Sequence, residues 1–283
     1  MTRRVSLPHP VTGELFPTPV PPGTGWPGDP ADADTPVARS AAGVARLAAR
    51  PTLDDLSARI SVCRACPRLV GWREAAASQK RASYDGEPYW GRPVPGWGSP
   101  TPGVLIVGLA PAANGGNRTG RNFTGDRSGD WIHAALHRTG LATQASSTHA
   151  GDGQRLLHTR MVATVRCAPP ANKPTPAERT TCAPWLHREL TLLLPTVRAI
   201  VCLGAIGWNA SWTALADIGL EVPRPRPSFG HGAEVAVGDL TVLGCYHPSP
   251  HNTFTGRLNE DMLDAVLTRA ASLAGWEAAP RAH

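Results

Sequence analysis

VLIVGLAPAANGGNRTGRNFTGDRSGDW, residues 104–131, is the stretch of this sequence that decides the fold. Its first five residues, Val104 to Gly108, are apolar and mostly β-branched, with Pro102 and Gly103 just before them. A short apolar run next to turn residues is typical of a strand buried in a parallel sheet. A glycine-rich loop follows, and a helical pattern begins at Ser128. The stretch therefore predicts one strand–loop–helix unit.

Three further apolar runs resemble the first, and helical patterns lie between them. The runs are MVATVR (161–166), AIVCLG (199–204) and TVLGCY (241–246); the helical patterns cover residues 128–137, 175–194, 205–215 and 259–273. Strands that alternate with helices predict a three-layer α/β/α fold with a central, mostly parallel four-stranded sheet. Ligands of such sheets bind beyond the carboxyl ends of the strands. Functional residues are therefore expected in the segments that follow the strands.

The N-terminal part of the chain looks different from the rest. Residues 1–50 contain clustered Pro, Gly, Asp and Ala with little periodicity, which predicts a mostly disordered N-terminal arm. A short helix is expected from Leu53 to Val62, capped by Thr52 and with acidic residues in its first turn. Residues 51–283 are expected to form a single domain.

Composition narrows the class of protein. The chain has 283 residues, of which 41% are hydrophobic, so a sizeable core can form. The net charge of +6 favours an anionic partner such as nucleic acid. No apolar run approaches the roughly 18 residues of a membrane span, and the first residues lack the apolar core of a signal peptide. We therefore expect a cytoplasmic protein without a membrane partner, and a monomer by default.

Four cysteines form two pairs with metal-ligand spacing. Cys63 and Cys66 form a C-x2-C pair after the first helix, whereas Cys167 and Cys182 have fourteen residues between them. In a reducing compartment a disulfide framework is disfavoured, and four thiolates from two segments fit a [4Fe–4S] cluster or an all-cysteine zinc site. The wide second pair disfavours zinc, and four buried free thiols are the alternative. Two further cysteines lie inside predicted strands and are assigned to the core: Cys202 and Cys245.

The loop after the first strand combines backbone donors with one aromatic ring. Its glycines allow the backbone to approach a ligand closely. Phe123 is the one large apolar residue in the middle of the loop, where it could stack on a planar base or anchor the loop on the core. Asp126 and Asp130 flank Ser128, and each could act in catalysis or cap the following helix.

The loop after the last strand, HPSPHNTFTGR (247–257), carries a histidine at the strand end. His247 could donate a hydrogen bond to an oxygen that gains negative charge, although a lone histidine is more often structural. Four other residues of this loop could contact DNA phosphates without reading sequence: Ser249, His251, Asn252 and Arg257.

Taken together, these segments resemble the uracil-DNA glycosylase superfamily, and most of all its family 5, the iron–sulfur type B enzymes. The resemblance rests on GLAPAANGGNRTGRNFTGD (108–126), CAPPANKPTP (167–176) and HPSPHNTFTGRL (247–258), together with the four cysteines. It covers about residues 52–275. No single motif would be specific, but the three in this order with four cysteines are.

The resemblance implies an enzyme of DNA base-excision repair. It would hydrolyse the N-glycosidic bond of uracil, and of other deaminated or damaged bases, and leave an abasic site. The four cysteines would hold a [4Fe–4S] cluster with a structural or DNA-positioning role. A flipped base would stack on Phe123, His247 would stabilise negative charge on uracil O2, and Asn172 would lie near the base edge. The backbone from Gly108 through Ala110 to Ala112 would line the pocket.

One departure from the wider superfamily concerns the attacking water. Many relatives place a carboxylate or a catalytic Asn in the first turn after the strand, where this chain has Leu109 and Ala110. Neither side chain can orient a water. Asp126 is the best remaining acid, with Asp130 and Asn117 as weaker candidates. Because a breaking glycosidic bond has oxocarbenium character, base departure can lead and water can follow.

Two other functions fit parts of the sequence. A non-catalytic iron–sulfur module that binds DNA would explain the charge and the cysteines, but it does not need Phe123 and His247 on facing loops. A metal-dependent nuclease needs several carboxylates at strand ends, and the sequence places none there. A monofunctional glycosylase is therefore the prediction.

Overall fold

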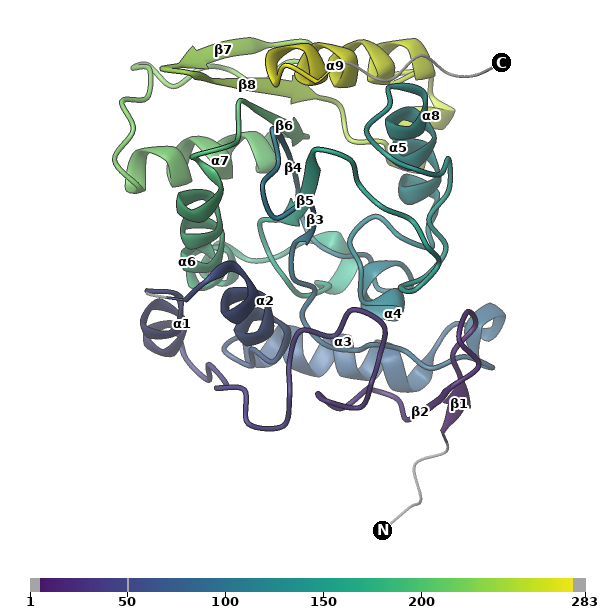
Figure 1. Cartoon of the computed structure of the whole chain (residues 1–283). Coiled ribbons are helices and arrows are strands. Elements are labelled where there is room, and N and C mark those ends of the chain that lie inside the picture. The colour runs from purple at the N-terminus through teal and green to yellow at the C-terminus, as the bar shows by residue number, and fades with distance from the viewer. Residues whose placement is uncertain (1–5, 50, 277–283) are drawn as a thin grey trace.

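The computed structural model describes residues 6–49 and 51–276. A six-stranded sheet lies at the centre, with the strand order β3-β5-β4-β6-β8-β7 (Figure 1). The strands are β3 (Trp97–Gly98), β4 (Val104–Gly108), β5 (Thr159–Ala163), β6 (Ala199–Leu203), β7 (Glu234–Val237) and β8 (Leu240–Cys245).

The four predicted strands are the four parallel strands of this sheet. Val107 of β4 pairs with Val162 of β5 on one side and with Cys202 of β6 on the other. The prediction of four strands is incomplete, because β3 and β7 add one antiparallel strand at each edge. β3 has two residues and β7 has four, so neither is long enough to stand out as an apolar run.

Helices cover both faces of the sheet, as predicted. On one face α6 (Pro176–Leu193) and α7 (Ala205–Asp217) pack a core that includes Leu186 and Trp208. On the other face α5 (Arg127–Arg138) and α9 (Glu260–Leu273) pack a core that includes Ile132 and Leu263. Figure 1 shows the two helix pairs on opposite sides of the strands. The result is the three-layer α/β/α arrangement.

The first cysteine pair lies in the turn between two helices beneath the sheet. The predicted cap by Thr52 is present at the start of α2 (Leu53–Ser61), and it forms a capping box with Asp55. α3 (Pro67–Gln79) follows directly and was not predicted, because its apolar residues form no continuous stripe. The other helices are α1 (Ala41–Ala48), α4 (Gly116–Thr119) and α8 (Pro250–Phe254), with short 3-10 turns η1 (Ala82–Tyr84) and η2 (Pro170–Asn172).

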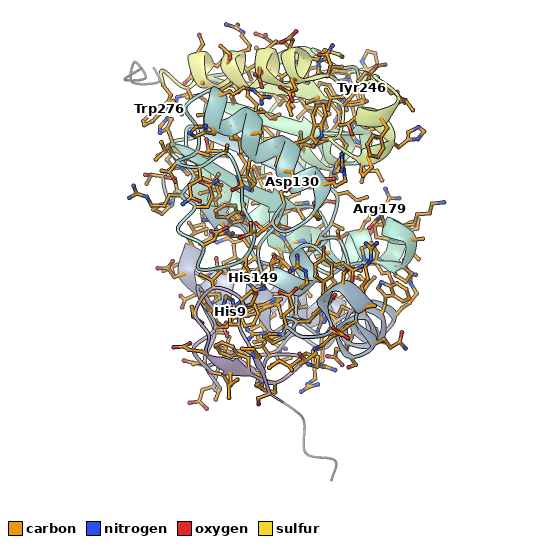
Figure 2. All side chains as sticks on the ribbon, turned by 90° about the vertical axis from the view of Figure 1, so that its right-hand side faces the viewer. His9, Asp130, His149, Arg179, Tyr246 and Trp276 are labelled. Atoms are coloured by element: carbon orange, nitrogen blue, oxygen red, sulfur yellow. The ribbon has the colours of Figure 1, made fainter. Side chains whose placement is uncertain are left out.

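The prediction of a mostly disordered N-terminal arm is wrong for residues 6–49. A hairpin of β1 (Leu7–Pro8) and β2 (Leu15–Phe16) opens this segment, which runs below α3 (Figure 1). Phe16, Val20 and Trp26 are buried against Trp90 of the main domain. His9 is also buried, with its ring 4.3 Å from that of His149 (Figure 2). Before α1 the segment lacks periodicity because single aromatic side chains attach it to the domain, whereas α1 packs through Val44 and Ala48 into the core around the cysteines.

In the described part of the chain, residues 6–49 and 51–276, no helix is long and apolar enough to cross a membrane.

Candidate active site

The site lies where the strand order changes direction. The chain runs from β4 to β5 on one side and then to β6 on the other side of β4. Crevices form at such switch points, beyond the carboxyl ends of the strands. The loops after β4 and β8 meet there, and they bring Phe123 and His247 to a ring-centroid distance of 5.8 Å. The structure thus brings together the two side chains that sequence reasoning placed on facing loops.

The Phe123 ring rests on the end of β4. A Cβ atom built on Gly108 would lie 2.9 Å from two ring carbons of Phe123, so only glycine allows this approach. Phe123 itself has a φ of 53°, a conformation that L-residues other than Gly rarely adopt. Part of the ring packs against the core and part is exposed. It therefore anchors the loop and also presents a surface on which a base can stack.

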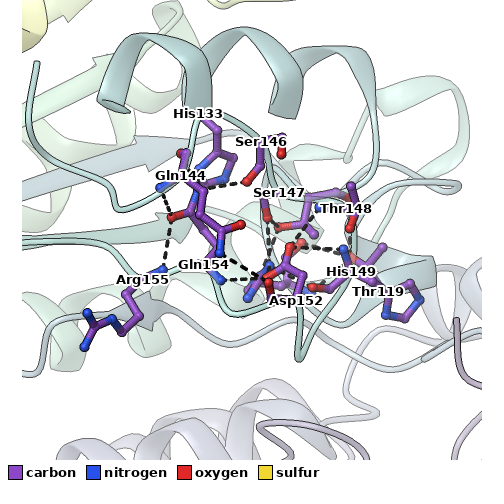
Figure 3. Close-up of polar contacts among 12 residues, drawn as sticks. Thr119, His133, Gln144, Ser146, Ser147, Thr148, His149, Asp152, Gln154 and Arg155 are labelled. Atoms are coloured by element: carbon purple, nitrogen blue, oxygen red, sulfur yellow. Dashed lines mark hydrogen bonds and ion pairs between the residues drawn. The ribbon is translucent and has the colours of Figure 1, made fainter. Parts of the chain in front are cut away.

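A network of buried polar side chains holds the Phe123 loop. Arg121 donates to the Asp152 carboxylate at 2.6 Å, and the hydroxyls of Thr124 and Ser147 are 2.8 Å apart. Asp152 also accepts the backbone N–H groups of Thr148 and His149 (Figure 3). Because these contacts lie on both sides of Phe123, they fix the loop backbone from which the ring projects.

A second group of contacts shapes the loop of His247. Asn252 donates its side-chain N–H to the His247 carbonyl at 2.8 Å, and Ser249 caps α8 by accepting the N–H of Asn252. Burial lowers the pKa of His247 to about 4. Its imidazole makes no hydrogen bond with residues 6–49 or 51–276. The ring is thus neutral at physiological pH and can donate one N–H to a ligand.

Asp126 caps a helix and also faces a cavity. Its Oδ1 accepts the N–H of Gly129 at 2.9 Å, which caps α5. The other carboxylate oxygen contacts the Gly115 backbone so closely that a Cβ there would lie 1.9 Å away. Burial raises the pKa of Asp126. Asp126 can therefore both cap α5 and act in catalysis, because one carboxylate oxygen is left for a ligand or a water.

Asp126 borders a cavity of about 350 Å³, within the usual range for small-molecule sites. Ala112 and the exposed Asn172, which were predicted to line the pocket and the base edge, also line this cavity. Neither Phe123 nor His247 lines this cavity. A larger cavity of about 560 Å³ lies between the N-terminal segment and α3 and contains none of the predicted catalytic or substrate-binding residues.

Several other predicted residues lie outside the cavity. Asn117 is fully buried, and its side chain donates to the backbone carbonyl of Arg73 at 3.1 Å. It therefore ties α4 to α3, whereas its Oδ1 has no partner among the described residues, and its proposed role with the water stays a prediction. Asp130 is exposed and Ala110 packs against the core around the cysteines.

The predicted DNA contacts on the His247 loop fall into two groups. Ser249 and Asn252 bond within their own loop. His251 and Arg257 are exposed, with the Arg257 guanidinium 4.5 Å from the centre of the Tyr246 ring.

The four predicted metal-binding cysteines come together around one enclosed cavity. Cys63, Cys66, Cys167 and Cys182 all line it, and none forms a disulfide. Burial raises the pKa of Cys66 to about 12 and also raises that of Cys182. In residues 6–49 and 51–276 no three or more His, Cys, Asp or Glu side chains form a group that could hold a metal ion.

Arg73, which sequence reasoning missed, points into this cysteine group. It is 1% exposed, and its guanidinium donates to the Cys167 sulfur at 2.9 Å and to the Cys63 carbonyl at 3.1 Å. Its Nε has no partner. A buried arginine cannot be distinguished from a surface one in a single sequence. The one feature of the sequence that could have pointed to Arg73 is its position seven residues after Cys66, which is about two turns along a helix.

Comparison with known proteins gives the family. Residues 95–271 match the model of the uracil DNA glycosylase superfamily. A protein of Mycobacterium tuberculosis (strain CDC 1551 / Oshkosh), named type-5 uracil-DNA glycosylase, is 55% identical over 271 residues, which are 95% of this chain and 100% of the relative. Proteins with the same name from Thermus thermophilus and Pyrobaculum aerophilum are 49% and 43% identical, over 76% and 78% of this chain and 95% and 93% of the relatives. The chain therefore belongs to the type-5 branch of the uracil-DNA glycosylase superfamily.

Proposed function

We propose that this protein is a monofunctional uracil-DNA glycosylase that hydrolyses the N-glycosidic bond of uracil in DNA, and of other deaminated or damaged bases, and leaves an abasic site. The observation that carries the proposal is the pairing of Phe123 with a neutral His247 on two loops at the strand ends. One side chain can stack on a flipped base, and the other can donate a hydrogen bond to its edge.

The leaving base takes the electron pair of the bond between its N1 and the sugar C1′. Negative charge then grows on the O2 oxygen of uracil. A neutral imidazole donates a hydrogen bond to that oxygen without transferring its proton, and such preorganised donors stabilise charge that develops in a transition state. The low pKa of His247 supports this role, because the ring stays neutral and needs no proton from solvent.

Water completes the reaction at C1′. In the proposal Asp126 accepts the proton of the attacking water while the water oxygen bonds to C1′. Its position on the cavity and its free carboxylate oxygen support this assignment. Its raised pKa also brings the carboxylate closer to the operating range of a general base. Asp130, which is exposed, is the alternative.

The cysteine group is proposed to hold a [4Fe–4S] cluster. Such a cluster binds one thiolate at each iron corner, so its four ligands stand farther apart than ligands on one ion. Four unpaired thiols around one cavity fit that need. The buried Arg73 guanidinium, within hydrogen-bond distance of the Cys167 sulfur, supports a site that carries negative charge. When bound, the cluster joins α2 and α3 to the segment after β5 and supplies no redox step.

DNA is the proposed partner, in line with the basic charge and the family. Ser249, His251, Asn252 and Arg257 remain the proposed phosphate contacts. Exposure of His251 and Arg257 supports direct contact. The internal bonds of Ser249 and Asn252 support a role in shaping the loop. A monomer that acts in the cytoplasm also stays a prediction.

One assay tests the proposed reaction. The protein is incubated with an end-labelled oligonucleotide that contains one uracil, and half of each sample is then heated with alkali. Strand cleavage only after alkali is expected, because a glycosylase leaves an alkali-labile abasic site. No cleavage in either half would favour a DNA-binding module without activity, and cleavage before alkali would favour a nuclease.

A second measurement tests the cluster. Protein purified without oxygen should be brown, with broad visible absorbance and about four irons per chain. A colourless protein with one zinc would contradict the proposal. Arg73→Met should retain less iron than Arg68→Met, since Arg68 lies on the same helix but pairs with Glu178 instead of a sulfur.

A further inference from the structure

The cavity at Asp126 has an outer wall that the proposed reaction does not use. Trp72 of α3, Arg81 and Tyr84 line this wall. Across the cavity lie Asp126 and Arg127, at the start of α5. Uracil stacked on Phe123 and bonded to His247 needs none of the three wall residues.

Trp72 is an unusual residue to find on a helix surface. Its side chain is 40% exposed, and in residues 6–49 and 51–276 its indole has no hydrogen-bond, cation–π or ring-stacking partner. Aromatic faces are the usual platform for unpaired nucleobases, because every base has a π-face. An exposed indole on a cavity next to a base-removal site is therefore suited to bind a second base.

Two arginines add positive charge to the same cavity. Within the described chain, Arg81 and Arg127 have no carboxylate partner, and the Arg81 guanidinium has no hydrogen bond. Arg127 has only a ring near it, with its guanidinium 4.8 Å from the centre of the Phe254 ring. Most buried arginines of this protein are paired, as Arg121 is with Asp152. Unpaired guanidinium groups at a cavity mouth are available for phosphate.

The wall is fixed in place relative to the catalytic loop. Arg118 lies 4.0 Å from the centre of the Tyr84 ring and donates to the Gly125 carbonyl, directly before Asp126. Lys80 donates to the carbonyls of Asp85 and Glu87, which closes the turn that follows α3.

A third contact ties α3 itself to this loop. The side chain of Asn117 donates to the carbonyl of Arg73, the residue after Trp72. Trp72 and Asp126 therefore stand on one braced unit, so a strand that enters the catalytic site also meets the wall.

We propose that this wall binds the nucleotide next to the damaged one in the same strand: its base stacks on Trp72, and its phosphate pairs with Arg81. The proposal rests on the glycosylase function proposed above. A base stacked on Trp72 has left its own base pair. The site therefore favours damage in single-stranded DNA, or in duplex ends and mismatches where the neighbour is already unpaired.

The test measures binding and stacking separately from excision. The ligand is a single strand with a tetrahydrofuran abasic analogue and 2-aminopurine on one side of it, placed 5′ in one oligonucleotide and 3′ in another. A fluorescent base is quenched when it stacks on an aromatic side chain. One of the two oligonucleotides should be quenched by the wild-type protein, unquenched by Trp72→Ala and partly quenched by Trp72→Phe.

Affinity for the same lesion in single and duplex strands gives the second readout. Trp72→Ala should weaken binding to the single strand by about tenfold or more, in line with the stacking of one base. The same substitution should weaken binding to a fully paired duplex by about threefold at most. Arg81→Gln should weaken single-strand binding and reduce its salt dependence by about one phosphate contact.

Two controls match the variants in exposure and type. Leu15→Ala removes an exposed apolar side chain from β2, and Arg46→Gln removes an exposed arginine from α1. Neither residue lines the cavity, and both should leave binding unchanged. Absence of quenching in both oligonucleotides, or equal losses of single-strand and duplex binding by Trp72→Ala, would overturn the proposal. The abasic analogue keeps this test independent of the uracil assay, so a wall that binds in a protein without excision activity would count against the proposed reaction alone.

Discussion

At the scale of single residues, the site depends on the protonation states of two side chains. His247 is held neutral by burial, whereas the pKa of Asp126 is shifted upward by the same cause. His247 acts as a neutral ring that donates its one N–H in a hydrogen bond. Asp126 acts as a carboxylate that accepts a proton from water. Burial disfavours the charged form of both side chains. It therefore lowers the pKa of His247, which keeps the ring neutral, and raises the pKa of Asp126, which makes the carboxylate a stronger base.

His247→Ala should slow single-turnover excision of uracil by about 100- to 1,000-fold, the usual effect of removing one preorganised donor to a developing anion. Binding of DNA that contains an abasic analogue should change by less than about threefold, because within the described residues the loop is held by a hydrogen bond to the His247 carbonyl and by none to its imidazole. Rapid-quench kinetics and fluorescence anisotropy give the two values. Equal losses in rate and binding would assign a structural role to His247.

Asp126→Asn tests the carboxylate through the pH profile. The wild-type excision rate should fall as the pH decreases through the raised pKa of Asp126, because the protonated acid cannot accept a proton from water. The variant should be slower at neutral pH and should lose this part of the acid limb. Asp130→Asn is the matched control. A normal rate in Asp126→Asn together with a slow Asp130→Asn would move the role to Asp130.

At the scale of elements, the loops matter as much as the strands that carry them. The loop between β4 and α5 is held by ion pairs and hydroxyl contacts as well as by the packing of Phe123 (Figure 3). Arg121 and Asp152 are both largely buried, so the loss of one partner leaves the other without compensation. Such a pair fixes a loop in one conformation, which a stacking ring requires.

Asp152→Asn should therefore reduce both stability and activity. We expect a loss of about 1–3 kcal/mol in the free energy of unfolding and a slower excision rate, since the Phe123 loop is no longer fixed. Asp264→Asn is the control, because Asp264 pairs with Arg138 between α5 and α9. That variant should lose stability without loss of the excision rate. Chemical denaturation and single-turnover kinetics separate the two effects.

Some elements could be predicted from sequence and others could not, for physical reasons. The parallel strands are buried on both faces and so read as continuous apolar runs, as in β4. The site pair Phe123 and His247 followed from strand ends and from family motifs. Arg73 and Trp72 did not, because their roles depend on burial and on neighbours that are distant in sequence. The contact of Asn117 could not be predicted for the same reason: its partner lies on α3, 44 residues away.

At the scale of the whole molecule, buried histidines connect stability to pH. Burial lowers the pKa of His133 and of His149 to about 3. His149 faces His9 and lies 3.6 Å from a carboxylate oxygen of Glu87. Folding therefore favours the neutral form of both rings, whereas the unfolded chain takes up protons below its usual pKa of about 6.5.

The sign of the effect follows from linkage. The contribution of these rings to stability is complete above about pH 6.5 and is lost as the pH falls toward their folded pKa values. Between pH 6.5 and 4.5 the two rings together should cost about 2–5 kcal/mol, at about 1.4 kcal/mol per pKa unit. Denaturation curves at several pH values measure this loss. A variant with Gln at positions 133 and 149 should show a flatter dependence, and an unchanged slope would contradict the assignment.

The packed N-terminal segment has a consequence for what this protein shares with its wider superfamily. The region that matches the superfamily model, residues 95–271, contains Cys167 and Cys182 but excludes Cys63 and Cys66. It also excludes Trp90 and the aromatic side chains that pack around it. Expressed alone, that region would expose Val165 and Trp185, which pack against α2 and α3, and it would keep two of the four proposed ligands. We therefore expect residues 95–271 not to fold on their own, because the part of the chain before residue 95 completes both their core and the proposed ligand set.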